Sequence, residues 1–332
     1  MTQSRVSFII PVLNDARRLA MCLQSIRRTL AAQGLVEIVV VDNGSTDGSA
    51  DVARRLGATV IVAEQGRVST LRNLGAARAI GDILAFVDAD HEIAAGWVMA
   101  ALDTLGQPDA GAAGALCQPP LDGTWVQRAY GYLRGRPRGR RDVEWLGSGN
   151  LAVWRHVFDQ LRGFDASLEA CEDVELCGRI RAAGYRVISD ARLDNVHHGD
   201  PRTLVALFRS ELWRGRDNLR VSLRGPITWR SLPSTVVPII DLAMVAIVLA
   251  GVIAGAAGYA PGLLAAAGAT AVILAGALAK VVRARLRDST WRAAGLLQVL
   301  VVACVYDCAR ALALLVRTPH RGAVRSTVPA VP

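Results

Sequence analysis

The chain has 332 residues, of which 52% are hydrophobic and only 5% aromatic, and its formal net charge is +9. The mean hydropathy is +0.30, and the apolar residues concentrate after about residue 233, which excludes a simple soluble protein and indicates membrane segments. A basic balance favours anionic partners such as nucleotide diphosphates or acidic lipids. No zinc-finger spacing, basic heptad region or basic stretch interleaved with aromatics indicates nucleic-acid binding.

The six cysteines show neither metal-site spacing nor a disulfide framework. No secretory signal pattern precedes the first apolar run, because residues 8–12 are too short for the hydrophobic region of a signal peptide. We therefore expect the part of the chain before the membrane segments to stay in the cytosol with reduced thiols.

The first 90 residues alternate between short apolar runs and stretches with helical spacing. The runs predict buried strands at 6–12, 36–41, 59–62 and 83–87. The stretches between them predict helices at about 16–30, over Ala50 to Leu56, and at 67–79. Four strand–helix alternations with short connections predict an α/β domain with a doubly wound, mostly parallel sheet. Such sheets bind ligands at the carboxyl ends of their strands, where Pro11, Asp42, Asp88 and Asp90 fall.

Two carboxylates, Asp88 and Asp90, follow the fourth strand with one residue between them. At a strand end residues i and i+2 point the same way, so the pair offers two hard oxygen ligands on one side. A divalent cation bound to a diphosphate needs such ligands. The alternative for an isolated pair of this kind is a solvated turn.

The middle of the chain is less regular. It predicts helices at 97–105, 169–184 and 203–223 and a strand at 111–117. The helix at 203–223 mixes leucines with arginines, which suits either a membrane surface or packing on the domain. The basic stretch 134–141 is rich in Gly and Pro and predicts a loop. It is either a solvated segment or a clamp for an anionic acceptor or lipid headgroups.

Two uncharged apolar segments, about 242–259 and 262–279, are just long enough to span a bilayer and form a hairpin. Arginines flank the hairpin on both sides, from Arg220 to Arg230 and from Arg283 to Arg292, which places both flanks in the cytosol. A last apolar stretch at 293–316 contains Asp307 and Arg310. It predicts an interfacial helix or one packed on the hairpin, with a third membrane span as the alternative.

Several motifs together resemble family 2 glycosyltransferases with the GT-A fold, of the membrane-anchored, non-processive type. Their order and spacing carry the resemblance, which covers roughly residues 5 to 220: Ile10-Pro11-Val12-Leu13-Asn14-Asp15, Val41-Asp42-Asn43-Gly44-Ser45-Thr46-Asp47, Arg72-Asn73-Leu74-Gly75, Phe86-Val87-Asp88-Ala89-Asp90, Gly147-Ser148-Gly149-Asn150, Gly163-Phe164-Asp165, Cys171-Glu172-Asp173-Val174-Glu175-Leu176, His197-His198-Gly199-Asp200 and Trp213-Arg214-Gly215.

The resemblance implies a site for a nucleotide-diphosphate sugar. Asp42 would hydrogen-bond the nucleobase beside the Pro11–Val12 backbone, with Asp15 near the ribose and Asp88 near the ribose or a metal-bound water. Arg72 would assist on the diphosphate. Asp90 is the expected ligand of Mg²⁺ or Mn²⁺, which would hold the charge of the leaving diphosphate. His197 matches the histidine that completes such a metal site, with His198 as the alternative.

By the same resemblance Glu172 and Asp173 lie at a helix start, and Asp173 is the expected catalytic base. The helix N-terminus is expected to lower the pKa of Asp173 and keep it ionised. Trp213 and Arg214 are expected on the acceptor side. They match poorly the Gln-x-x-Arg-Trp element of processive members, which disfavours a polysaccharide synthase.

The sequence thus predicts a catalytic domain over 1–225 and a membrane anchor over 226–332. The expected function is inverting transfer of a sugar to a lipid-linked or glycan acceptor at the cytosolic face of the cell membrane, in contact with membrane lipids. A polyprenyl-phosphate sugar synthase is the alternative within the class. The rival outside it is a non-catalytic protein that binds nucleotide sugars.

Overall fold

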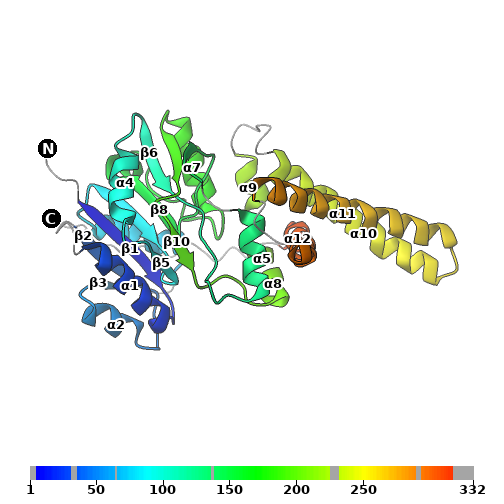
Figure 1. Cartoon of the computed structure of the whole chain (residues 1–332), viewed down its shortest axis with the longest axis horizontal. Helices are drawn as coiled ribbons and strands as arrows, with labels where there is room; N and C mark the ends of the chain where they lie inside the picture. The colour runs from blue at the N-terminus through cyan, green and yellow to red at the C-terminus, as the bar shows by residue number, and fades with distance from the viewer. Residues whose placement is uncertain are drawn as a thin grey trace.

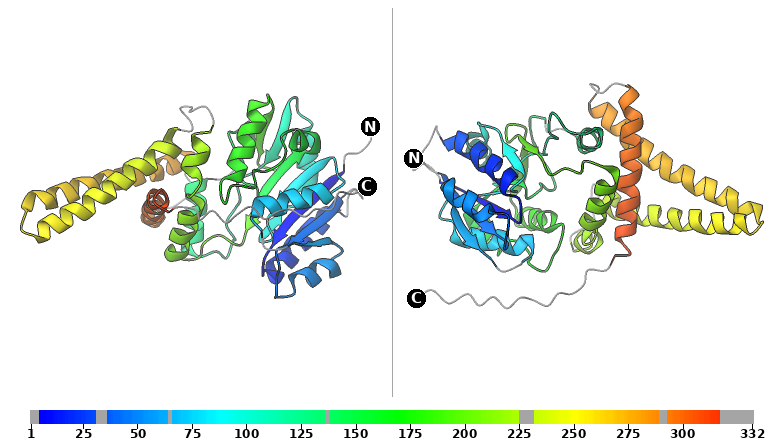
Figure 2. Two further views of the ribbon diagram at one scale, coloured as in Figure 1. Left: turned by 180° about the vertical axis from the view of Figure 1, so that it is seen from behind. Right: turned by 90° about the horizontal axis from the view of Figure 1, so that it is seen from below.

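The computed structural model describes residues 5–30, 36–63, 66–135, 138–224, 232–288 and 293–316. An α/β domain forms one end of the molecule, and a long helical hairpin projects from the other (Figure 1). Helices cover both faces of the sheet, as the strand–helix alternation predicts (Figures 1 and 2).

The central sheet has eight strands in the order β3-β2-β1-β4-β8-β6-β9-β7. β1 to β4 run parallel to one another, and β8 and β7 run antiparallel to their neighbours. This confirms the doubly wound, mostly parallel sheet. A separate antiparallel ribbon pairs β5 (His91–Ile93) with β10 (Asn195–His197). The strands of the large sheet are β1 (Val6–Val12), β2 (Val36–Asp42), β3 (Thr59–Val62), β4 (Ile83–Val87), β6 (Ala110–Gly114), β7 (Arg140–Asp142), β8 (Asn150–Trp154) and β9 (Arg186–Asp190).

Both faces of the sheet carry a hydrophobic core, which explains why β4 is apolar throughout and β1 is apolar except for the buried Ser7. Phe8 and Ile10 of β1 pack into the core under α1 and α4, whereas Ile9 packs into the core under α3, α6 and α7. Alternate side chains of a strand point to opposite faces, so a strand covered on both sides has no solvent-facing positions. The helices of this domain are α1 (Ala16–Leu30), α2 (Ser49–Arg55), α3 (Val68–Arg78), α4 (Trp97–Leu105), α5 (Trp125–Arg134), α6 (Arg155–Gln160), α7 (Glu172–Ala182), α8 (Leu204–Arg214) and α9 (Asn218–Ser222).

The prediction of a loop over 134–141 is partly wrong. Arg134 ends α5, which starts with a capping box between Thr124 and Gln127. Arg140 lies in the edge strand β7, where its guanidinium binds Asp190 at 3.0 Å and also pairs with Asp103. These tertiary ion pairs let a basic segment join the sheet. Residues 136 and 137 lie outside the described part of the chain.

The predicted helix at 203–223 is interrupted. α8 ends at Arg214 and α9 begins at Asn218. The interruption falls at Gly215, where a Cβ atom would meet the Cβ atom of Ala313 at 2.5 Å. The helix is thus interrupted where α12 packs against it, and the local sequence pattern does not indicate this contact.

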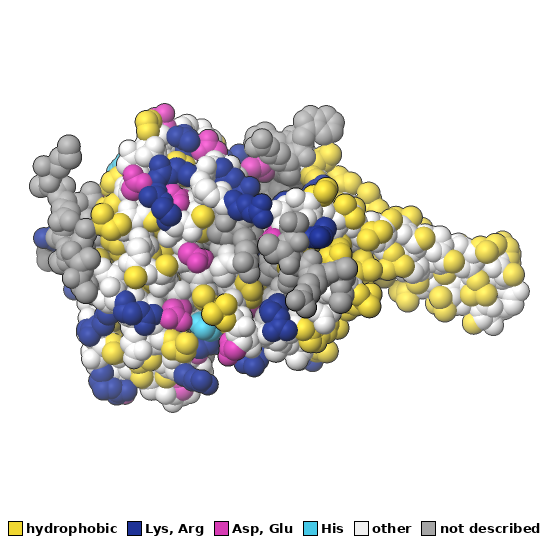
Figure 3. Space-filling view, in the orientation of Figure 1, with side chains coloured by type: hydrophobic (Ala, Val, Ile, Leu, Met, Phe, Trp, Pro, Cys, Tyr) yellow, Lys and Arg dark blue, Asp and Glu magenta, His cyan; other side chains and the backbone are white. Residues whose placement is uncertain are grey.

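Three helices of the described residues are long and apolar enough to cross a membrane: α10 (Leu232–Ala256), α11 (Ala260–Arg287) and the part Gly295–Ala313 of α12 (Ala293–Ala313). α10 and α11 form the predicted hairpin, but each is longer than predicted. α10 extends back to Leu232, before the predicted start at 242, and therefore includes Pro238 and the buried Asp241. Along the part of the hairpin visible in Figure 3, many side chains are hydrophobic. The flanking Arg230 and Arg292 lie outside the described residues.

α12 runs across the base of the hairpin rather than along it (Figures 1 and 2). It shares a third hydrophobic core with α5, α8 and α11, formed by residues such as Tyr130, Leu207, Val281 and Val302. Both charges that interrupt its apolar pattern have partners in this layer. Asp307 pairs with Lys280 of α11, and Arg310 binds Glu211 of α8 at 2.9 Å. The described cysteines are all free thiols.

Candidate active site

The ends of β1 and β2 form the first wall of the site. Register pairs Pro11 with Val41 and Val12 with Asp42. Asp42 is 2% exposed; its Oδ2 accepts a hydrogen bond from the Ser45 backbone N–H at 3.2 Å, but its Oδ1 has no partner among the described residues. A buried carboxylate oxygen without a donor is costly. This oxygen therefore fits a donor supplied by a ligand, such as a nucleobase N–H.

Asp15 lies at the start of α1 and binds Arg18. The Arg18 Nε donates to the Asp15 carboxylate at 2.7 Å, and another nitrogen of the same guanidinium lies 3.8 Å from Asp90. Arg18 therefore brings a positive charge from α1 to the aspartates that follow β4. Motif reasoning did not identify Arg18, because a single arginine on an amphipathic helix carries no signal by itself.

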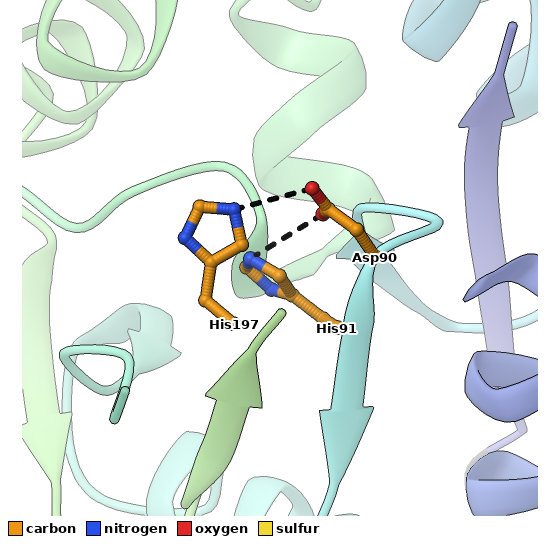
Figure 4. A group of neighbouring side chains, drawn as sticks. All are labelled: Asp90, His91 and His197. Carbon is orange, nitrogen blue, oxygen red and sulfur yellow. Dashed lines mark ion pairs between the residues drawn. The ribbon is translucent and has the colours of Figure 1, made fainter. Parts of the chain in front are cut away.

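Asp90, His91 and His197 form a cluster whose ligand atoms all lie within 4.8 Å of one another (Figure 4). Asp90 and His91 come from the turn after β4 and the start of β5, and His197 comes from β10, which pairs with β5. The Asp90 carboxylate lies 3.3 Å from His197 Nε2 and 3.9 Å from His91 Nε2. One carboxylate and two imidazoles are a donor set that suits Mn²⁺ and other transition metals.

The outer contacts of the cluster orient both imidazoles. His91 Nδ1 lies 2.5 Å from the Gly149 carbonyl, and His197 Nδ1 lies 2.9 Å from Asp200 Oδ1. These contacts leave both Nε2 atoms directed at Asp90, which is the arrangement of metal-binding histidines. His198 Nε2 instead lies 3.2 Å from Glu92, so the geometry favours His197 over His198.

Electrostatics within the cluster are strong. Burial opposes ionisation of Asp90, but the contact with His197 holds the pKa of Asp90 well below its usual range. Burial and the neighbouring His197 lower the pKa of His91 to about 4. Burial would lower the pKa of His197, but Asp200 and Asp90 outweigh it and raise the value to about 9. In the absence of a metal, Asp90 and His197 thus form an ion pair.

Asp88 joins a second network, centred on Arg72. The Arg72 guanidinium is 3% exposed and donates to Asp88 at 2.6 Å and to Glu172 at 2.7 Å. The Ser148 hydroxyl donates to the same oxygen of Glu172 at 3.0 Å. Arg72 was predicted at the diphosphate. Here its two terminal nitrogens are held by two carboxylates, while its buried Nε has no hydrogen-bond partner among the described residues.

Asp173 lies beside this network at the start of α7. Its carboxylate accepts the backbone N–H groups of Val174 at 2.8 Å and Ser148 at 3.3 Å. Burial and the negative charge of Glu172 raise the pKa of Asp173 to about 7. The prediction that the helix N-terminus lowers this pKa is wrong, because burial and like charge outweigh the helix dipole and two hydrogen bonds.

Trp213 and Arg214 lie at the end of α8. Trp213 is exposed, whereas Arg214 binds Glu211 and the Tyr130 hydroxyl, each at 2.9 Å. Arg214 is therefore part of the contact with α5 and α12. Its acceptor-side role stays a prediction, as do the roles of the other site residues.

His91, Ser148 and Asp200 were missed as individual site residues. A signal existed for each: His91 follows Asp90 directly, Ser148 lies in a Gly-Ser-Gly turn, and Asp200 follows His197 at i+3. Their place in the site is recognised only from their contacts with residues elsewhere in the chain.

Gly199→Ala is expected to weaken Mn²⁺ binding about tenfold or more, because a Cβ atom at position 199 would overlap the Asp90 carboxylate. Titration of the purified protein with Mn²⁺, followed by calorimetry, checks this. Gly178→Ala is the matched control, since no atom lies within 4 Å of its added Cβ. An unchanged Mn²⁺ affinity in folded Gly199→Ala would contradict the role given to Asp90.

Comparison with known proteins finds glycosyltransferases among the relatives of this chain. The model of the family "Glycosyl transferase family 2" matches residues 7–158. Glycosyltransferase AglE of Haloferax volcanii is 29% identical over 236 residues, covering 68% of this chain and 76% of the relative. Succinoglycan biosynthesis protein ExoA of Rhizobium meliloti is 27% identical over 272 residues, covering 75% of this chain and 80% of that protein.

Among solved structures, the fold is similar to that of a mannosyltransferase from Pyrobaculum calidifontis in complex with GDP-Man and Mn²⁺. The TM-score is 0.59 at 19% identity, and the similarity covers 93% of this chain and 87% of the other. The sheet therefore has the GT-A fold. The region that matches glycosyl transferase family 2 spans β1 to α6 and carries Asp42, Asp88 and Asp90, and the relatives similar to this chain include a glycosyltransferase.

Proposed function

We propose that this enzyme transfers a sugar, with inversion, from a nucleotide-diphosphate sugar to a lipid-linked or glycan acceptor at the cytosolic membrane face. One observation carries the proposal: Arg72 binds Asp88, at the donor end of the site, and Glu172, beside the candidate base Asp173. The same buried guanidinium thus fixes the donor and acceptor halves of one site relative to each other. The unpartnered Oδ1 of Asp42 supports a nucleotide at the ends of β1 and β2.

In the proposed reaction the acceptor hydroxyl oxygen attacks the anomeric carbon. The bond from that carbon to the diphosphate oxygen breaks on the opposite face, and the hydroxyl proton passes to the Asp173 carboxylate. A base with a pKa of about 7 is ionised in much of the population at neutral pH and still accepts a proton well. Ser148 N–H and Val174 N–H orient this carboxylate.

Asp90 and His197, with His91 as a further ligand, would hold Mn²⁺ or Mg²⁺. When bound, the metal would supply positive charge for the leaving diphosphate. The donor set fits such an ion because two oriented imidazole nitrogens and a carboxylate already converge. Mn²⁺ with GDP-Man in the similar mannosyltransferase supports this choice.

In the proposed membrane arrangement the α10–α11 hairpin spans the bilayer and α12 lies at the cytosolic interface. With about 1.5 Å rise per residue, both hairpin helices exceed the roughly 30 Å hydrocarbon core. α12 runs across the hairpin. Its axis is therefore not aligned with the hairpin axis that would cross the bilayer. Arg283, Arg285 and Arg287 at the end of α11 support a cytosolic flank.

The test uses the full-length enzyme in lipid nanodiscs with a panel of nucleotide-diphosphate sugars. We expect release of nucleoside diphosphate from one donor class with Mn²⁺, and loss of the signal with EDTA. Addition of a lipid extract should raise the release rate if the acceptor is lipid-linked. Absence of release from every donor, with folded protein and lipids present, would contradict the proposed function.

A further inference from the structure

A continuous chain of buried and partly buried polar contacts connects the candidate metal cluster to the C-terminal helix α12. It begins at His197, whose Nδ1 lies 2.9 Å from Asp200. The Asp200 side chain is fully buried and pairs with Arg134, the last residue of α5. The Arg134 guanidinium lies over the ring of Tyr130, 4.3 Å from its centroid.

The second half of this chain starts at Tyr130. The Tyr130 hydroxyl donates to Glu211 of α8 at 2.6 Å. The Glu211 side chain is fully buried and accepts Arg214 at 2.9 Å and Arg310 of α12 at 2.9 Å. These contacts thus connect four elements that are far apart in the sequence: β10, α5, α8 and α12.

Burying these charges is not an obvious way to stabilise the fold. Removing carboxylates and guanidinium groups from water costs several kcal/mol per ion, and apolar residues of similar volume often serve as well or better. The arrangement is, however, well suited to fixing orientation. The Asp200 carboxylate lies beside His197 Nδ1, His197 Nε2 faces Asp90, and Arg134 pairs with Asp200.

We propose that Arg134 and Glu211 are positioning residues through which docking of α12 fixes the orientation of His197. The anchor region then does more than hold the enzyme at the membrane: Arg310 completes the support of the metal cluster from the membrane side. The inference rests on the proposed metal-dependent function, but it concerns residues outside the donor site and the base.

The experiment measures Mn²⁺ affinity of the full-length protein in nanodiscs, without donor or acceptor. Arg134→Leu is expected to raise the Kd for Mn²⁺ about 10- to 100-fold. Arg310→Leu should raise it in the same direction by a smaller factor, because it acts through Glu211 and Tyr130. Arg310→Lys keeps the charge beside Glu211 and should restore most of the affinity. Arg186→Leu is the control, because Arg186 pairs with Asp142 of the edge strand β7 at 2.7 Å and donates to the Pro108 carbonyl, neither of which belongs to this chain of contacts.

Hydrogen exchange supplies a readout that needs no metal. Arg310→Leu and Glu211→Gln should speed amide exchange across residues 195–200, relative to wild type and Arg186→Leu. Unchanged Mn²⁺ affinity and unchanged exchange in this segment, with only a lower unfolding temperature, would overturn the inference and leave a purely structural network. Failure of the wild-type protein to bind Mn²⁺ would remove the metal from the proposed function. The rate of amide hydrogen exchange across residues 195–200 would then decide whether α12 docking fixes His197.

Discussion

Asp173→Asn is expected to lower kcat by about 10²- to 10⁴-fold, the range of a positioned general base. The amide keeps the shape of the side chain, and its one oxygen can still accept the N–H of Val174 or that of Ser148, which bond to different oxygens of Asp173. It accepts no proton from the acceptor hydroxyl. Nucleotide binding should persist, since Asp42 and the β1–β2 edge are unchanged. Steady-state kinetics together with nucleotide-dependent thermal shifts measure both quantities.

Glu175→Gln is the matched control for this variant. Glu175 lies on the same helix but binds Arg179 at 2.6 Å, away from the site, so turnover should stay near the wild-type value. Near-normal turnover of Asp173→Asn would contradict the role of Asp173 as base. It would favour transfer to a polyprenyl phosphate, whose oxygen is already ionised and needs little base assistance.

The pH dependence follows from the raised pKa of Asp173. Below about 7 the base is protonated, so kcat/KM of the wild type should fall about tenfold per pH unit. An unfolded Asp ionises near 4, so the folded state binds more protons between about 4 and 7 and loses stability as pH rises through that window. Asp173→Asn should therefore unfold at a higher temperature than wild type at pH 8.

Asp90→Asn is expected to abolish measurable Mn²⁺ binding and to lower kcat/KM by about 10³-fold. The loss corresponds to several kcal/mol of charge stabilisation on the leaving diphosphate. The amide oxygen is a weaker ligand than a carboxylate and leaves the imidazoles of His91 and His197 without the negative group between them. Mn²⁺ titration and kinetics over a range of metal concentrations measure the effect.

Glu92→Gln serves as the control for Asp90→Asn. Glu92 lies two residues further along and binds Arg28 at 2.7 Å and His198 at 3.2 Å, outside the cluster. It should keep Mn²⁺ affinity and rate within a few-fold of wild type. Partial rescue of Asp90→Asn by high Mn²⁺ would agree with a lost ligand. Full activity of Asp90→Asn in EDTA would rule out the metal role.

Much of the fold was predictable because its strands are short, apolar and separated by regular helices. β1, β3 and β4 and helix α4 begin and end where the pattern predicts them. The motifs also placed Asp42, Asp88 and Asp90 at one sheet edge, since parallel strands present their carboxyl ends together. Local pattern was less informative for β7, which pairs with β9 and whose Arg140 is held by Asp103 and Asp190.

The sequence by itself determined the class of fold, the family resemblance, the hairpin and the order of the site motifs, because these depend on residue types at short spacing. Only the tertiary structure decided that His91 joins Asp90 and His197, that Arg72 is held between Asp88 and Glu172, and that the pKa of Asp173 rises rather than falls. It also decided that α12 crosses the hairpin and reaches Glu211. These features depend on burial and on charges brought together from distant parts of the chain, which no local spacing records.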